Sequence, residues 1–216
     1  MSVYEVLLRV EADEDTTPEM VRQEIYRACD EVPFGFDVEK VEARMSVLDE
    51  IDRLAEVAHC GQVDKIGDPY VNHVRSVAAG LVAFPVEVQM AGLLHDILED
   101  TEMTAYGLRR LGVQERVIRV VEAVTKQKGL TREANLRRVL GGGYHAILVK
   151  ISDNAHNSRP DRAARIDDEA TRIRLAEKYR EARKILWPAA QAHDIEEIVR
   201  IVNPHLLGEL NGLDAS

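Results

Sequence analysis

Residues 93–101 place four side chains that could bind a metal or move a proton on little more than one helical turn. The segment reads Leu-Leu-His-Asp-Ile-Leu-Glu-Asp-Thr and contains His95, Asp96, Glu99 and Asp100. A helix that buries the apolar residues of this segment also brings its carboxylates towards the interior, where unpaired charge is costly. Because a bound cation would remove that cost, the segment predicts a catalytic metal site.

Further ligands are expected from two other helices. His73 lies on the preceding predicted helix and Asp153 lies in the segment 148–157. Two imidazoles and two carboxylates suit a divalent first-row ion such as manganese, iron or zinc better than a closed zinc site of thiolates. We therefore predict that His73, His95, Asp96 and Asp153 hold one divalent ion. Manganese readily accepts the five or six ligands that leave positions open for chemistry.

Glu99 and Asp100 follow His95 and Asp96 by four residues, so each points to the same side of a helix as its partner. We predict that they are catalytic and that they orient a water molecule or accept its proton. The alternative is a helix end with solvated acids. Acids at a helix C-terminus oppose the helix dipole, which makes that alternative less favourable.

The candidate substrate-binding residues are cations and one amide near these positions. Lys150, Asp153 and Asn157 have the spacing of one polar stripe on a helix. Lys65 lies in a loop with glycine and proline, and Arg159 follows the segment that contains Asp153. Lys150, Asn157, Lys65 and Arg159 are thus predicted to contact phosphate oxygens or a ribose hydroxyl. A surface lysine or a salt bridge to an acid is the alternative for Lys150.

The other five histidines have no comparable acidic neighbours. They are expected to be structural or surface residues, with His59 and His156 the least clear cases. These histidines are His59, His145, His156, His193 and His205.

From residue 46 onwards the hydrophobic spacing predicts an almost entirely helical chain. One helix is expected to begin at Ser46 and to end in the turn 65–69, the next to begin at Pro69, and a third, which carries His95, to begin at Pro85. Further helices are expected at 104–111, 113–126, 131–140, 144–157 and 165–200.

The first 45 residues have a different pattern. Residues 3–11 and 36–45 alternate like strands, and between them Thr17 and Pro18 predict the start of a helix. The predicted fold class is therefore mainly α, with a helical domain at 46–200, a C-terminal tail at 201–216 and a small strand–helix–strand (α+β) appendage at 1–45. We expect the appendage to pack on the main body or to mediate self-association as a homo-oligomer.

Composition limits the function classes. The 216 residues carry a formal charge of −10, which argues against broad binding to nucleic acid or to an anionic membrane. The sequence has two cysteines, no N-terminal apolar secretion segment and no apolar run long enough to span a membrane. These features predict a cytoplasmic protein without disulfides whose partner is a small molecule.

In their order along the chain, these residues resemble the HD superfamily of metal-dependent phosphohydrolases, and more closely the alarmone hydrolase domain of RelA/SpoT-type enzymes and of small stand-alone alarmone hydrolases. The resemblance covers about residues 47–192. The matching blocks are 58–62 with Lys65, Gly67, Pro69, Tyr70 and His73, then 93–101, 124–126, 149–157 with Arg159, and 178–190.

The resemblance implies a helical HD domain that holds one Mn²⁺ through His73, His95, Asp96 and Asp153. It also implies that Glu99 and Asp100 serve the hydrolytic water. The family reaction removes the 3′-pyrophosphate of ppGpp or pppGpp and returns GDP or GTP. Lys65 and Asn157 match family positions that hold this substrate.

One difference from the RelA/SpoT-type enzymes leaves alternative functions to consider. Where the long RelA/SpoT enzymes have Arg-Lys-Ser in the loop, this chain has Asp64-Lys65-Ile66, so a cation available to the nucleobase is missing. One alternative is therefore an HD phosphohydrolase for another nucleotide, such as a deoxynucleotide or a nicotinamide dinucleotide phosphate. Another is a catalytically silent nucleotide-sensing module, although the presence of both Glu99 and Asp100 argues against it. The chain is too short for a synthetase domain, so hydrolysis without synthesis is expected.

Overall fold

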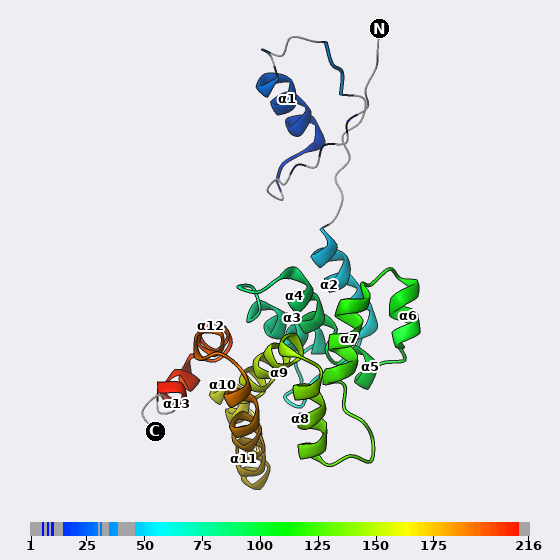
Figure 1. Ribbon diagram of the computed structural model, residues 1–216. Helices are drawn as coiled ribbons and strands as arrows, with labels where there is room; N and C mark the ends of the chain where they lie inside the picture. Colours follow the sequence, from blue (N-terminus) through cyan, green and yellow to red (C-terminus); the bar gives the residue numbers. More distant parts are fainter. Residues whose placement is uncertain are drawn as a thin grey trace. The chain divides into compact units, whose positions relative to one another are not determined.

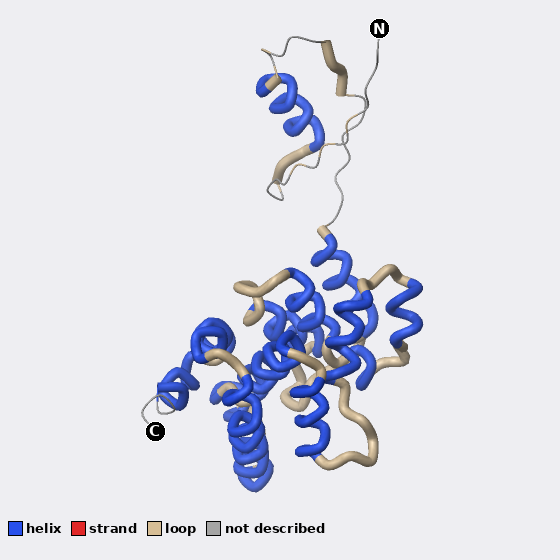
Figure 2. Tube along the Cα trace, in the orientation of Figure 1, coloured by secondary structure: helices blue, strands red, loops and turns tan. Residues whose placement is uncertain are grey.

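A computed structural model describes residues 6, 8, 10, 15–29, 31, 35–38 and 46–211 (Figure 1). The chain divides into two compact units, Met1–Ser46 and Val47–Ser216. The described residues contain helices and loops but no strand (Figure 2), which confirms the prediction of a mainly helical chain. In this part of the chain no helix has both the length and the apolar character of a membrane span.

The first unit contains α1 (Pro18–Ala28), which begins where the sequence predicts. The Thr17 hydroxyl accepts the backbone N–H of Met20 at 3.2 Å, and Pro18 occupies the first turn. The predicted strands at 3–11 and 36–45 fall largely outside the described residues, and the described residues among them form no strand. The strand–helix–strand appendage is therefore not supported.

The second unit is a helical bundle. Its longer helices are α2 (Val47–Ala58), α3 (Tyr70–Ala79), α4 (Val86–Leu94), α7 (Glu115–Val124), α8 (Arg132–Gly141), α9 (Tyr144–Asn157), α11 (Glu169–Leu186) and α12 (Ala192–Val202). Its shorter elements are α5 (Ile97–Asp100), α6 (Ala105–Arg110), α10 (Pro160–Ala164), η1 (Trp187–Ala189), η2 (Pro204–Leu206) and α13 (Leu207–Asn211).

Two of these helices form the centre of the bundle. α9 packs against α3, α4, α7, α8, α11 and α12, and α4 packs against α2, α3 and α7 as well (Figure 1). Both are buried over most of their length, and the apolar core forms around them. Polar residues on α9 and at the end of α4 are consequently held at fixed positions inside the protein.

Two predicted helices are interrupted. The helix that was expected to run through 93–101 ends at Leu94, and a new short helix, α5, begins after Asp96. The helix expected at 165–200 is divided into α11, η1 and α12. Pro188 explains the second interruption, because proline lacks the N–H that a continuing helix needs.

The C-terminal segment continues the packing of the bundle. Leu206 and Leu210 are buried in the same apolar core as α9. The domain limits predicted at 45/46 and 200/201 stay predictions.

Close packing around Gly80 gives a test of this arrangement. A Cβ atom at Gly80, which ends α3, would lie 2.3 Å from Val202 Cγ2 and 2.6 Å from Ser152 Oγ. We expect Gly80→Ala to lower the free energy of unfolding by about 1–3 kcal/mol, the usual cost of overpacking a core. Urea unfolding followed by circular dichroism measures this change.

Gly141→Ala is the matched control, because Gly141 ends α8 and nothing lies within 4 Å of a Cβ atom there. We expect this variant to be at least as stable as the wild type. Equal stability of the two variants would contradict the packing of α3 against α9 and α12.

Candidate functional site

Three elements bring the four predicted metal ligands together. His73 comes from α3, His95 and Asp96 from the break between α4 and α5, and Asp153 from α9. His73, His95 and Asp96 each offer one ligand atom, and these atoms lie within 4.8 Å of one another. Asp153 Oδ1 lies 3.5 Å from His73 Nε2 and 3.8 Å from His95 Nε2. All four residues are buried.

The surroundings of His95 show that this cluster fits a cation. Its Nδ1 lies 2.8 Å from the carbonyl oxygen of Gly92, so Nδ1 carries a hydrogen and Nε2 presents a lone pair. Nε2 is buried, has no hydrogen-bond partner and lies 2.9 Å from Asp96 Oδ2. Two electron-rich atoms at this distance need a proton or a cation between them. Imidazole nitrogen and carboxylate oxygen are common ligands of first-row divalent ions.

The pKa values of His95 and Asp96 reflect the closeness of this imidazole nitrogen and this carboxylate. Burial opposes protonation of His95, but the Asp96 carboxylate outweighs it and raises the pKa of His95 to about 8. Burial would raise the pKa of Asp96, but His95 and His73 hold it well below the usual value. The cluster is therefore poised to hold positive charge.

His156 is a member of the cluster that the sequence did not reveal. Its Nδ1 lies 2.7 Å from Nδ1 of His73, so the two atoms share one hydrogen. Burial and then the nearby His73 and arginine side chains lower the pKa of His156 to about 3, which keeps it neutral. A hydrogen on Nδ1 of His73 leaves Nε2 of that ring free to bind a metal. His156 thus orients His73, and no local signal shows this because the two residues are 83 positions apart.

Tyr70 connects a candidate ligand to a candidate catalytic acid. Its hydroxyl lies 2.7 Å from Asp96 Oδ2 and 2.9 Å from Asp100 Oδ2. Burial and the Asp96 charge raise the pKa of Tyr70, so the hydroxyl stays a neutral donor. Tyr70 lies in one of the blocks that resemble the alarmone hydrolases, but no role was predicted for it. Its position three residues before His73 on one helix face is the signal that could have found it.

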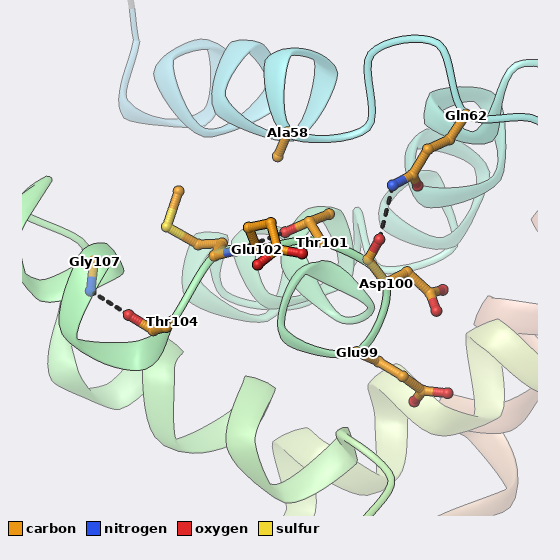
Figure 3. Close-up of a pocket in the computed structure, with 9 residues that line it drawn as sticks. Ala58, Gln62, Glu99, Asp100, Thr101, Glu102, Thr104 and Gly107 are labelled. Atoms are coloured by element: carbon orange, nitrogen blue, oxygen red, sulfur yellow. Dashed lines mark hydrogen bonds between the residues drawn. The ribbon is translucent and has the colours of Figure 1, made fainter.

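Glu99 and Asp100 lie on α5, and their side chains leave the helix on the same side, away from Glu102 (Figure 3). Lys126 Nζ donates to Glu99 Oε1 at 2.5 Å. Gln62 donates to the backbone carbonyl of Asp100 at 2.7 Å, as the dashed line in Figure 3 shows. Both residues line a cavity of about 850 Å³ that extends along residues 99–107. They are accordingly fixed beside an open space.

Two of the predicted substrate-binding residues, Lys150 and Asn157, contact Asp153. Lys150 Nζ lies 2.6 Å from Asp153 Oδ2, and the Asn157 amide donates to Asp153 Oδ1. Burial opposes the charge of Lys150, but Asp153 and Asp96 outweigh it and raise the pKa of Lys150. The two residues hold Asp153 in place, and the salt bridge considered as the alternative for Lys150 is present.

For the other two predicted substrate-binding residues, the described part of the chain shows no hydrogen bond or ion pair with Asp153. Arg159 makes two hydrogen bonds to Asp161, at 2.9 and 2.8 Å, and lines a separate cavity of about 190 Å³ on the side of His156. The structure does not bring Arg159 into the ligand cluster. Lys65 is exposed in the loop before α3.

The fold and the ligand cluster define a helical domain with a candidate metal site, and the comparisons identify its family. Residues 53–202 match the family model described as HD domain. Since this match covers more than half of the chain, the protein belongs to the HD domain family. The resemblance seen in the sequence is confirmed.

Curated relatives match part of the chain. The bifunctional (p)ppGpp synthase/hydrolase SpoT of Escherichia coli K12 is 32% identical over 149 residues, which cover 58% of this chain and 21% of that protein. A GTP pyrophosphokinase of Streptomyces coelicolor is 34% identical over 159 residues, covering 67% and 18% of the two chains. The chain thus spans about a fifth of the length of these relatives.

A solved structure supports the fold. It is described as a metazoan ortholog of SpoT that hydrolyses ppGpp, and it is 24% identical with a TM-score of 0.59. The similarity covers 74% of this chain and 97% of that one. At this level of identity the comparison establishes a shared fold.

Proposed function

We propose that the protein is a Mn²⁺-dependent pyrophosphohydrolase that removes the 3′-pyrophosphate of (p)ppGpp-like nucleotides in the cytoplasm. The convergence of His73, His95, Asp96 and Asp153, with Tyr70 linking Asp96 to Asp100, carries this proposal. The names of the relatives support the substrate class, because several are guanosine-3′,5′-bis(diphosphate) 3′-pyrophosphohydrolases. The cavity beside Glu99 and Asp100 has the size of a small-molecule site.

In this proposal the four ligands hold one divalent ion. The ion supplies a Lewis acid for the phosphoryl group and makes a water molecule more acidic. Lys150 and Asn157 keep Asp153 in place, and His156 keeps Nε2 of His73 available. Asp96 is fixed by the hydroxyl of Tyr70.

The chemistry is a hydrolysis in which water attacks phosphorus. The bond from water oxygen to the 3′ phosphorus forms as the bond from that phosphorus to the ribose 3′ oxygen breaks. Glu99 or Asp100 takes the proton from water, the ribose oxygen gains a proton, and pyrophosphate leaves. The other product is GDP from ppGpp or GTP from pppGpp.

A second candidate is hydrolysis of another nucleotide, such as a deoxynucleotide or a molecule like NADPH. The loop before α3 favours it, because Asp64 replaces the arginine of the long RelA/SpoT enzymes and pairs with Arg162 at 2.8 Å. The loop therefore offers no guanidinium to a guanine base. A silent nucleotide sensor is less well supported, since both candidate catalytic acids are present on α5 and the Tyr70 hydroxyl links Asp100 to the candidate ligand Asp96.

A product assay tests the proposal. Purified protein is incubated with ppGpp, pppGpp, deoxynucleotides and NADPH, each with Mn²⁺, with Mg²⁺ and with EDTA. We expect GDP and pyrophosphate from ppGpp with Mn²⁺ and neither product with EDTA. Hydrolysis of only the other nucleotides would establish the second candidate. No turnover of any nucleotide at high enzyme concentration would favour the sensor.

A further inference from the structure

The block 58–62 resembles the alarmone hydrolases, but the proposed function gives its side chains no role. His59 in this block is only 2% exposed, and its ring stacks on that of Tyr70 with 4.9 Å between the ring centres. Nδ1 of His59 lies 2.8 Å from Oε1 of Gln62. Gln62 in turn donates from Nε2 to the backbone carbonyl of Asp100 at 2.7 Å (Figure 3). These contacts connect the turn after α2 to a candidate catalytic acid.

The contact with Asp100 determines the donors and acceptors along this connection. A carbonyl oxygen only accepts, so the amide nitrogen of Gln62 faces Asp100 and its Oε1 faces His59. Nδ1 of His59 must then carry the hydrogen, because Oε1 has none to donate. The opposite orientation of the Gln62 amide would place two oxygens against each other. His59 therefore favours the one orientation in which Gln62 donates to Asp100.

The same turn fixes Tyr70, the second partner of Asp100. The backbone N–H of Tyr70 donates to the carbonyl oxygen of Gln62 at 3.0 Å, and His59 stacks on its ring. The Tyr70 hydroxyl lies 2.9 Å from Asp100 Oδ2. Gly61 closes the turn with φ +76°, a conformation that residues with a side chain rarely adopt. Asp100 is thus held at its backbone by Gln62 and at its carboxylate by Tyr70.

Asp100 depends on such contacts because α5 is a single helical turn. The helix has four residues, and Asp100 is the last of them. The last four carbonyl groups of a helix have no partner within the helix, so each needs one from elsewhere. Gln62 supplies this partner to Asp100 from 38 positions away. One helical turn has little stability of its own, so contacts with the rest of the protein set where its carboxylates lie.

We propose that Gln62 is a positioning residue for the candidate catalytic acid Asp100, and that His59 sets the orientation of the Gln62 amide. This inference rests on the proposed function, in which Asp100 orients the attacking water or takes its proton. His59, which was expected to be structural or at the surface, is buried and acts on Asp100 through Gln62.

Hydrogen–deuterium exchange tests the contact with Asp100 without turnover. Mass spectrometry follows a peptide that covers residues 97–103 in the wild type and in Gln62→Met, which keeps the length of the side chain and removes its amide. Loss of one hydrogen bond commonly shifts a local opening equilibrium about fivefold, so amide exchange in this peptide should become about fivefold faster. A peptide from α8 should exchange as in the wild type. Unchanged exchange of 97–103 would overturn the proposal.

Kinetics separate a positioning role from a merely structural one. With ppGpp and Mn²⁺, Gln62→Met should lower kcat about 10-fold and leave KM within twofold, because Gln62 acts on the acid and not on the substrate. Asp100→Asn should lower kcat about 100-fold. The double variant should be no slower than Asp100→Asn, since a residue that acts only through Asp100 then has nothing to position. Losses that multiply in the double variant would contradict this role.

His59→Phe tests the first contact of the connection. Phenylalanine keeps an aromatic ring against Tyr70 but cannot donate to Gln62, so the Gln62 amide loses the contact that sets its orientation. We expect kcat to fall about threefold, and to fall no further when His59→Phe is added to Gln62→Met. An additional loss in that double variant would overturn the role of His59.

Gln89→Met is the matched control. Gln89 is another partly buried glutamine that donates to a backbone carbonyl, that of Phe84 at 3.2 Å. Its kcat should stay within twofold of the wild type, and a loss as large as that of Gln62→Met would count against a specific role of Gln62. If the wild type hydrolyses no nucleotide, the proposed function fails, while exchange in 97–103 still decides whether Gln62 holds Asp100.

Discussion

Asp153→Ala is expected to lose most of the bound Mn²⁺. Asp153 is one of the four proposed ligands, and its Oδ1 lies 3.5 Å from Nε2 of His73 and 3.8 Å from Nε2 of His95. Removing one carboxylate from a small ligand set lowers both the number of bonds and the negative charge that attracts the ion. Dialysis against Mn²⁺, followed by elemental analysis of the protein, measures the ion content per chain.

This variant also leaves the Lys150 ammonium without its partner at 2.6 Å. Breaking a buried ion pair by removing one partner costs roughly 3–5 kcal/mol, so Asp153→Ala alone is expected to be less stable. Lys150→Met combined with Asp153→Ala removes the unpaired charge and restores stability, and it should still lack the ion. Asp161→Ala, on α10 and paired with Arg159, should retain it. One ion per chain in the folded double variant would overturn the ligand assignment.

Helix positions with a local signal could be predicted from the sequence. Thr17 and Pro18 start α1, Pro85 precedes α4, and α9 occupies the predicted residues 144–157. In each case the signal lies in the chain itself, as a capping hydroxyl, a proline or a run of apolar spacing. The interruption at Pro188 had such a signal too, and the predicted helix at 165–200 ignored it.

The break at His95 and Asp96 could not be predicted in this way. No glycine or proline interrupts 93–101, and the segment has helical spacing throughout. The chain leaves the helix at Asp96, with φ −103° and ψ −1°, where Tyr70 from α3 holds the carboxylate. This contact joins residues 26 positions apart, and the pattern of one sequence does not contain such a contact.

The same distinction applies to the candidate site. The ligand types and their order were sufficient to select the four residues that converge. The same information was not sufficient to predict which side chains contact each of these residues, because those contacts depend on how the helices cross. Lys150 could be a phosphate contact or a salt-bridge partner from its type alone, and the structure places it 2.6 Å from Asp153. His156 was one of the two least clear histidines, and it contacts His73.

Glu99→Gln is expected to reduce kcat about 100-fold while the Mn²⁺ content stays unchanged. Loss of a positioned acid or base commonly lowers the rate by 10²–10⁴-fold. Glu99 is not one of the four ligands, and an amide has nearly the same shape, so the metal centre should remain intact. Hydrolysis rates with ppGpp and elemental analysis of the same preparation measure the two quantities.

A Lys126 variant separates a catalytic role of Glu99 from a structural one, because Lys126 makes two hydrogen bonds to the Glu99 carboxylate. Its Nζ donates to Oε1 at 2.5 Å, and its backbone N–H donates to Oε2 at 3.2 Å. Lys126→Met keeps the second bond and removes the first, so it should lower kcat less than Glu99→Gln does. If Glu99 served only to pair with Lys126, the two variants would have equal effects.

Glu102→Gln is the matched control for the loss of one carboxylate. Glu102 lines the same cavity as Glu99, but its side chain leaves the chain on the other side (Figure 3). We expect its kcat to stay within twofold of the wild type, because its carboxylate points away from those of Glu99 and Asp100 (Figure 3). Undiminished turnover in Glu99→Gln would make Glu99 a structural partner of Lys126. The role of proton acceptor would then pass to Asp100, which Tyr70 already connects to Asp96.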